Sequence, residues 1–172
     1  PPFDHPDIIE GQATVAAEIL EQMPEGEAPD LVLLPVGGGG LSSGVTGYLA
    51  GAVPDSGFRF VEPAGAPSLR RSLEKGEVVK LPKVDNFVDG AAVARIGDLN
   101  FSALKRFDAE QVLLVPENAI CVTMIDMLNV EGVVLEPAGA LSIAALSRIP
   151  REELAGRNVV AVVSGGNFDF ER

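Results

Sequence analysis

The fold is decided by residues 31–44, which read LVLLPVGGGGLSSG. Its opening run of Val and Leu, without strict alternation, is typical of a strand buried on both faces. Four consecutive glycines at positions 37–40 follow, and the small and polar residues after them suit the start of a helix. The stretch therefore predicts a strand, a loop and a helix in direct succession. We call residues 37–40 the tetraglycine loop.

The tetraglycine loop predicts an anion-binding site. Glycine permits positive φ and lets a ligand approach the backbone closely. Successive backbone N–H groups and the following helix N-terminus can then hold a phosphate without a basic side chain. The run matches neither G-x-G-x-x-G nor G-x-x-x-x-G-K-[ST], which argues against a dinucleotide or nucleoside-triphosphate site. A flexible turn is the alternative, and the position between a buried strand and a helix disfavours it.

Apolar runs like the first recur along the chain and alternate with segments of helical spacing. The runs cover residues 58–61, 112–115, 133–135 and 159–163, and helices are expected over 9–23, after 116–118 and over 140–146. This alternation indicates βαβ units. We expect one α/β domain over residues 1–172, a doubly wound, mainly parallel sheet with helices on both faces. Residues 82–100 lack clear periodicity and predict a long irregular connection, which is often functional in compact domains.

Composition limits the classes of partner. The chain has 25 acidic and 13 basic residues and a formal charge of −12, a field that repels nucleic acid. No apolar run approaches the roughly 20 residues that span a bilayer, so no membrane partner is expected. The single cysteine, Cys121, and single histidine, His5, exclude an internal disulfide and a Cys- or His-rich metal site. A cytoplasmic location is expected.

Three further motifs carry candidate site residues. Ser164 and the residues Gly-Gly-Asn after it follow the apolar run 159–163. Because ligands bind at the carboxyl ends of parallel strands, Ser164 is expected at the same edge as the tetraglycine loop. Asp89-Gly90 lies in the irregular connection, and Glu136 follows the run 133–135, predicting a strand that ends in a carboxylate. Taken alone, Asp89-Gly90 is most often a turn, and Glu136 an acid in a first helical turn.

These four motifs, in this order, resemble the pyridoxal-phosphate-dependent serine and threonine dehydratases, close to the biosynthetic threonine dehydratases. The opening Pro2-Phe3-Asp4 and the segment Gly11-Gln12-Ala13-Thr14 are similar to that family's segment before the glycine loop, although Ala13 stands where a second glycine is usual. Residues 87–93, followed by Arg95-Ile96-Gly97-Asp98, point to threonine dehydratase. The resemblance covers essentially the whole chain and implies the tryptophan-synthase-β-like fold.

The resemblance also assigns roles to residues. It implies that the phosphate of pyridoxal 5′-phosphate is bound by the backbone N–H groups of Gly37, Gly38, Gly39, Gly40 and Leu41. Ser164 would hydrogen-bond the pyridine nitrogen, Gly90 would line the ring, and Glu136 would lie near the active site. A neutral hydroxyl does not hold that nitrogen protonated as a carboxylate would, which suits elimination of a β-hydroxyl over transamination. Ser68 stands where an acidic metal ligand is usual, so no metal ion is expected.

The lysine that such enzymes need for their Schiff base to the cofactor is not found in these motifs. In the family it lies upstream, in a Ser-Phe-Lys type motif followed by a Ser-Gly-Asn-His type loop, and this sequence has neither. Lys75, Lys80, Lys83 and Lys105 lack that context and are expected on the surface. The resemblance thus implies a fragment without the lysine-bearing N-terminal part or a C-terminal regulatory domain, inactive on its own.

For the parent enzyme, the resemblance implies deamination of L-threonine, with L-serine as a second substrate, to a 2-oxo acid and ammonia. It implies isoleucine biosynthesis as the setting and a homo-oligomer, dimer or tetramer, as the assembly. Cysteine synthase or threonine synthase chemistry is the alternative within the same fold. Outside enzymology, the alternatives are a non-catalytic domain that binds a sugar phosphate or nucleotide, and an interaction fragment without a ligand.

Overall fold

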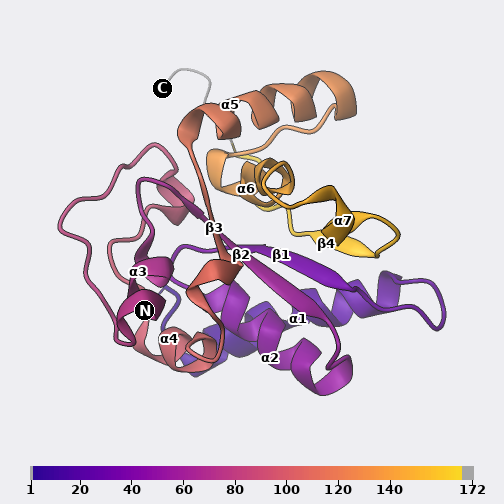
Figure 1. The fold of residues 1–172 in the computed structure, drawn as a ribbon, viewed down its shortest axis with the longest axis horizontal. Helices are drawn as coiled ribbons and strands as arrows, with labels where there is room; N and C mark the ends of the chain where they lie inside the picture. The colour runs from indigo at the N-terminus through magenta and orange to yellow at the C-terminus, as the bar shows by residue number, and fades with distance from the viewer. Residues whose placement is uncertain (1, 168–172) are drawn as a thin grey trace.

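The computed structural model describes residues 2–167, which form a four-stranded sheet with helices on both faces (Figure 1). The strands are β1 (Leu31–Pro35), β2 (Gly57–Pro63), β3 (Val112–Val115) and β4 (Val159–Ala161). The helices are α1 (Pro6–Gln22), α2 (Gly40–Ala52), α3 (Ser68–Lys75), α4 (Asp98–Leu104), α5 (Glu117–Asp126), α6 (Pro137–Leu146) and α7 (Arg151–Leu154). Short helical turns are η1 (Asp89–Ala91), η2 (Ala109–Gln111) and η3 (Met127–Glu131).

The sheet has the order β3-β2-β1-β4, and every neighbouring pair is parallel. In register, Leu31 lies opposite Gly57 on one side and Val159 on the other. From β1 the chain builds outward through β2 and β3, and then returns to place β4 on the opposite side of β1. The strand order therefore reverses between β1 and β4. In open α/β sheets such a reversal leaves a crevice at the carboxyl ends of the strands, where ligands bind.

Each face of the sheet has its own hydrophobic core. All five residues of β1 are buried, and they alternate between the two layers. Val32 and Leu34 pack with apolar residues of α1, α2, α3 and α4, whereas Leu31 and Leu33 pack with those of α5 and α6. Figure 1 shows α1 and α2 below the sheet and α5, α6 and α7 above it. The prediction of a doubly wound parallel sheet is confirmed.

The predicted strand over residues 133–135 is wrong. Gly132 ends η3 in a left-handed conformation, with φ of 68°, and Pro137 begins α6, so only four residues lie between them. They pair with no strand; instead the N–H of Glu136 donates a 2.9 Å hydrogen bond to the carbonyl of Gly165. Val133 and Val134 are each 39% exposed. A three-residue apolar run has too little length to distinguish a strand from a connection.

The other strand predictions agree with β1, β2, β3 and β4, and the predicted helices agree with α1, α5 and α6. The irregular connection ends sooner than expected, because α4 begins at Asp98. The carboxylate of Asp4 accepts hydrogen bonds from the first backbone N–H groups of α4, those of Asp98 and Leu99, each at 2.9 Å. A helix start stabilised from a distant part of the chain has no local sequence signal. Within residues 2–167, no helix is long and apolar enough to cross a membrane.

Candidate functional site

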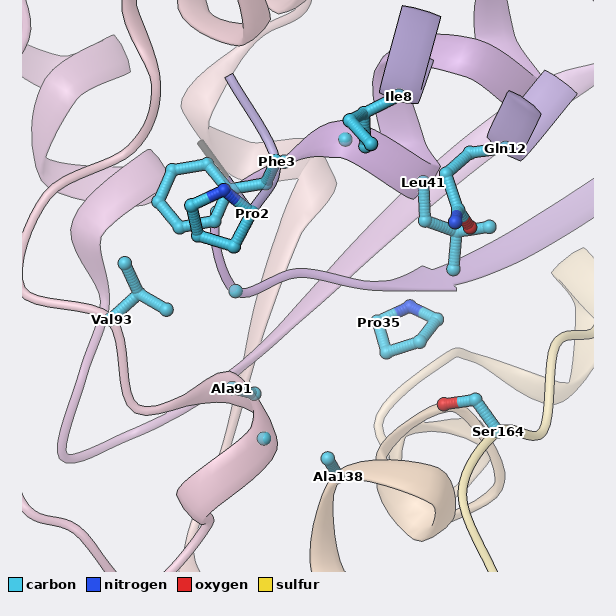
Figure 2. Close-up of a pocket in the computed structure, with 15 residues that line it drawn as sticks. Pro2, Phe3, Ile8, Gln12, Pro35, Leu41, Ala91, Val93, Ala138 and Ser164 are labelled. Atoms are coloured by element: carbon cyan, nitrogen blue, oxygen red, sulfur yellow. The ribbon is translucent and has the colours of Figure 1, made fainter. Parts of the chain in front are cut away.

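A cavity of about 350 Å³ lies where β1 and β4 end, at the reversal of strand order. The tetraglycine loop follows β1 at this point, and Ser164 follows β4. We call it the first cavity, and its lining residues are Pro2, Phe3, Ile8, Gln12, Pro35, Gly37, Gly38, Gly39, Gly40, Leu41, Gly90, Ala91, Val93, Ala138 and Ser164 (Figure 2). The structure thus brings together seven of the eight predicted site residues; the exception is Glu136.

The tetraglycine loop packs closely against neighbouring parts of the chain, which is possible because its residues are glycines. A Cβ on Gly37 would lie 3.1 Å from the carbonyl oxygen of Gly90, and a Cβ on Gly38 would overlap the ring of Phe3. Gly39 has φ of 93°, which side chains other than glycine rarely adopt. Close approach to the backbone is what a phosphate bound by N–H groups requires.

The start of α2 is suited to an anion. Gly39 is its N-cap residue and offers no side-chain hydrogen bond to the first turn. The first N–H groups of a helix lack partners within the helix and carry partial positive charge. Gly40, Ser42 and Ser43 are buried, so these N–H groups lie at the end of a covered helix. A bound phosphate would satisfy them, and the residues present therefore fit the phosphate of pyridoxal phosphate.

Ser164 is held by contacts between its loop and the start of α6. A Cβ on Gly139 would overlap the carbonyl oxygen of Ser164, so only glycine permits this approach. The carboxylate of Glu136 accepts a 3.1 Å hydrogen bond from the N–H of Asn167. Figure 2 shows the Ser164 hydroxyl oxygen pointing toward the space between Pro35 and Ala138. The hydroxyl is therefore presented to the first cavity by a fixed backbone.

A second cavity of about 1030 Å³ adjoins the first and shares Gly90 and Ala138 with it. Glu136 lies here, next to the first cavity and not in it. The other lining residues are Asn86, Phe87, Asp89, Cys121, Met124, Ile125, Pro137 and Asn167. Among residues 2–167, its acidic lining residues are Asp89 and Glu136, so a positively charged group that enters meets two carboxylates. The sequence motif Asp89-Gly90 thus contributes Gly90 to both cavities and the Asp89 carboxylate to the second.

Basic side chains are absent from the described lining of both cavities. Lys75, Lys80, Lys83 and Lys105 are all exposed, as expected from their sequence context. In a chain of formal charge −12, an anion in the first cavity would be bound by backbone dipoles. The arrangement can bind a phosphate and a ring nitrogen, and within residues 2–167 it offers no amine to react with a carbonyl group.

Glu62 is a buried carboxylate that sequence reasoning did not single out as a structural residue. It is the penultimate residue of β2, and its side-chain oxygens accept hydrogen bonds from the backbone N–H groups of Leu69 at 2.7 Å and Arg70 at 2.9 Å. Ser68 Oγ donates a longer bond of 3.4 Å. Burial nevertheless raises the pKa of Glu62 to about 7. Glu62 therefore stabilises the start of α3.

The expectation that no metal ion binds stays a prediction. Within residues 2–167, no three His, Cys, Asp or Glu side chains lie together in a way that could hold one. The oxygens of Glu62, the carboxylate nearest to Ser68, already accept backbone hydrogen bonds.

The start of the chain contributes to the first cavity, which sequence reasoning missed. Pro2 and Phe3 line it, and Figure 2 shows both rings beside the tetraglycine loop. Ile8 and Gln12 of α1 complete that side. The signal was present in the opening motif Pro2-Phe3-Asp4, but no period or spacing relates it to residues more than 30 positions away.

Sequence comparison relates the chain to known enzymes. The family model described as pyridoxal-phosphate dependent enzyme matches residues 1–165. The L-threonine dehydratase biosynthetic IlvA of Bacillus subtilis (strain 168) is 48% identical over 171 residues, which are 99% of this chain and 40% of that protein. The protein of the same name from Mycobacterium leprae (strain TN) is 46% identical over 173 residues, again 40% of its length. The chain thus spans about 40% of the length of these curated relatives.

Structure comparison agrees. The processed form of threonine deaminase isoform 2 from Solanum lycopersicum superposes with a TM-score of 0.91 and 38% identity, over 99% of this chain and 49% of that one. Maize serine racemase superposes with a TM-score of 0.88 and 32% identity, over 99% of this chain and 52% of that one.

Proposed function

The chain belongs to the pyridoxal-phosphate-dependent enzymes, and from that premise we propose that it is the phosphate-binding part of a threonine dehydratase. The observation that carries the proposal is the meeting of the tetraglycine loop and Ser164 at one cavity, where the strand order reverses. The similarity to threonine dehydratases along 99% of the chain supports this choice among enzymes of the family. The reaction proposed is conversion of L-threonine to a 2-oxo acid and ammonia.

Each site residue has a proposed task. The N–H groups of the tetraglycine loop and Leu41 bind the phosphate. Ser164 hydrogen-bonds the ring nitrogen, and its neutral hydroxyl leaves that nitrogen without the proton that a carboxylate would hold there. Gly90 leaves room for the ring between the two cavities. Glu136 acts on Ser164 through the Asn167 N–H, by fixing the loop that carries the serine.

Pyridoxal phosphate, when bound, supplies an electron sink that makes the α-proton of an amino acid removable. The chain's own contribution to a β-elimination is then to hold that group and to keep its nitrogen neutral. The wall of the first cavity consists mainly of apolar side chains and backbone, with Gln12 and Ser164 as its polar side chains among the described residues.

We further propose that this chain works within a polypeptide of the relatives' length. The lysine that bonds to the cofactor would come from the part that precedes the chain, since the described cavities contain none. The chain alone is then expected to be inactive. L-serine as a second substrate, a role in isoleucine biosynthesis, a cytoplasmic location and a homo-oligomeric assembly belong to the same proposal.

The experiment is an assay of the full-length polypeptide with pyridoxal phosphate. Release of 2-oxobutanoate and ammonia from L-threonine is expected, with pyruvate from L-serine. Borohydride reduction followed by peptide mapping should place the cofactor adduct on a lysine outside residues 1–172. A stoichiometric adduct on a lysine of this chain would contradict the proposed division of the site.

Further measurements on the same full-length polypeptide separate the alternatives. Sulfide-dependent consumption of O-acetylserine, or threonine formation from phosphohomoserine, would support a β-replacement or synthase reaction instead. Stabilisation by a sugar phosphate or nucleotide but not by pyridoxal phosphate would support a non-catalytic domain.

A further inference from the structure

Asn100 joins three segments beside the tetraglycine loop. Its side chain is fully buried, and Nδ2 donates hydrogen bonds to the carbonyl oxygens of Gly38 at 2.9 Å and Phe3 at 3.1 Å. Its backbone carbonyl accepts a 3.5 Å hydrogen bond from Ser43 Oγ, in the first turn of α2. Oδ1 has no hydrogen-bond partner among residues 2–167, so the side chain acts there through its NH₂ group.

The Gly38 carbonyl is held by two donors from the start of α4. Besides Asn100 Nδ2, the backbone N–H of Gly97 donates to it at 3.2 Å. A trans peptide unit is planar, and its N–H points opposite to its carbonyl. The N–H of Gly39 therefore points away from α4. Because Gly39 lines the first cavity, the orientation of this one peptide decides whether an anion there meets its N–H.

A peptide between two glycines has little orientation of its own. Reversing the 38–39 peptide changes only ψ of Gly38 and φ of Gly39, and glycine adopts either sign of φ with similar ease. The orientation must therefore be set by contacts from outside the loop. Two hydrogen bonds set the orientation of this peptide, and the one donated by the buried NH₂ of Asn100 is the shorter. The same NH₂ holds Phe3, whose ring lies against Gly38.

We propose that Asn100 is a positioning residue that fixes the 38–39 peptide so that the Gly39 N–H faces the cofactor phosphate. Asn100 is not among the residues that line either cavity, so it acts through Gly38 and touches no ligand. The inference rests on the proposed function in one respect, namely that the anion in the first cavity is the phosphate of pyridoxal phosphate.

The test compares Asn100→Leu with wild type in the full-length polypeptide. Leucine has a similar size and no N–H to donate. The affinity of the cofactor-free protein is measured for pyridoxal phosphate and for pyridoxal, which has the same ring and no phosphate. Hydrogen exchange of peptides covering residues 37–41 is measured without cofactor. Ser72→Ala is the matched control, because Ser72 is also fully buried and its hydroxyl makes two hydrogen bonds to backbone groups, Ser68 O and Val79 N, in α3 and just after it.

Asn100→Leu is expected to weaken pyridoxal phosphate binding about tenfold, because one hydrogen bond, from the Gly39 N–H to the phosphate, is lost. Binding of pyridoxal should stay unchanged. Exchange of residues 37–41 should become faster. Ser72→Ala should lower the melting temperature without changing the ratio of the two affinities. A general loss of stability cannot produce this phosphate-specific change.

Equal weakening of both ligands by Asn100→Leu, or unchanged exchange of residues 37–41, would overturn the inference. If wild type itself binds pyridoxal phosphate no tighter than pyridoxal, the proposed function fails first, and this inference with it. Should leucine prevent folding, Asn100→Asp gives the same comparison, since an ionised carboxylate donates no hydrogen bond. Its affinity for pyridoxal phosphate should then improve as the pH is lowered and the carboxyl regains a proton to donate.

Discussion

The backbone carbonyl of Ser164 occupies the space that a side chain at position 139 would need. This contact joins the loop after β4 to the first turn of α6, and Gly139 is buried at that point. The spacing between the two elements is therefore set by the absence of a Cβ, and the Ser164 hydroxyl depends on that spacing for its position at the first cavity.

Gly139→Ala should destabilise the protein, because the added methyl group must displace backbone. Overpacking of this kind costs roughly 1–3 kcal/mol, and affinity for pyridoxal phosphate should fall as Ser164 moves. Gly47→Ala is the matched control: Gly47 also lies within a helix, and a Cβ there meets nothing within 4 Å. That substitution should stabilise by about 0.5–1 kcal/mol through helix propensity alone. The melting temperature should fall in Gly139→Ala and rise in Gly47→Ala. A fall in both variants would contradict the explanation by overpacking at Gly139.

Gly39→Ala should lose more stability than Gly76→Ala, although both glycines have positive φ, 93° and 75°. Alanine at either position adopts a left-handed conformation that costs about 1–2 kcal/mol. Only at Gly39 does the new Cβ also meet Asn100 Cβ, at 2.9 Å, whereas at Gly76 nothing lies within 4 Å. Denaturant unfolding measures both costs. Equal losses of stability in the two variants would show that Asn100 does not restrict the space at Gly39.

How much of this site could be predicted depends on how local its determinants are. β1 and the tetraglycine loop follow from consecutive residues, because burial on both faces and freedom of φ are properties of a short stretch. The position of Ser164 at the same edge of the sheet could be predicted in the same way, because it follows a second apolar run. Residues 133–135 misled because three apolar residues carry no period, and the glycine and proline on either side decide their structure.

The support of the loop could not be predicted from any pattern. Asn100 and Gly38 are 62 positions apart, and Asp4 and Asp98 are 94 positions apart. Asparagine at position 100 suits a surface helix as well as a buried bridge, and only the packing of α4 against α2 selects the second. Glu62 likewise has the sequence context of any strand end, and its burial depends on α3 folding over it.

Ser164→Asp should change the outcome of the proposed β-elimination more than the affinity for pyridoxal phosphate. A carboxylate at this position would keep the ring nitrogen protonated and so favour side reactions at the α-carbon over loss of the β-hydroxyl. For the proposed reaction of the full-length polypeptide, the expected result is less 2-oxobutanoate and more D-allothreonine, the α-carbon epimer of L-threonine, per turnover, measured by chiral chromatography. Ser164→Ala, which adds no charge, should lower affinity about tenfold by loss of one hydrogen bond and should leave the product ratio unchanged. The same product ratio in the aspartate variant would show that Ser164 does not face the ring nitrogen.

Glu62 should make stability fall as the pH rises. Burial raises its pKa in the folded protein from 4.5 to about 7, so between these values the folded state holds a proton that the unfolded state has released. Folding stability therefore decreases between about pH 4.5 and pH 7, by about 3 kcal/mol if each unit counts about 1.4 kcal/mol, and stays lower above that window. Glu62→Gln cannot ionise and should abolish this decline. Glu74→Gln, also on α3, is the control: hydrogen bonds from Arg70 and Arg71 lower the pKa of Glu74, so its own contribution is lost only as the pH falls into the acid range. Unfolding by denaturant across pH 4–8 makes the comparison, and a Glu62→Gln variant that retains the full decline would place the titrating group elsewhere.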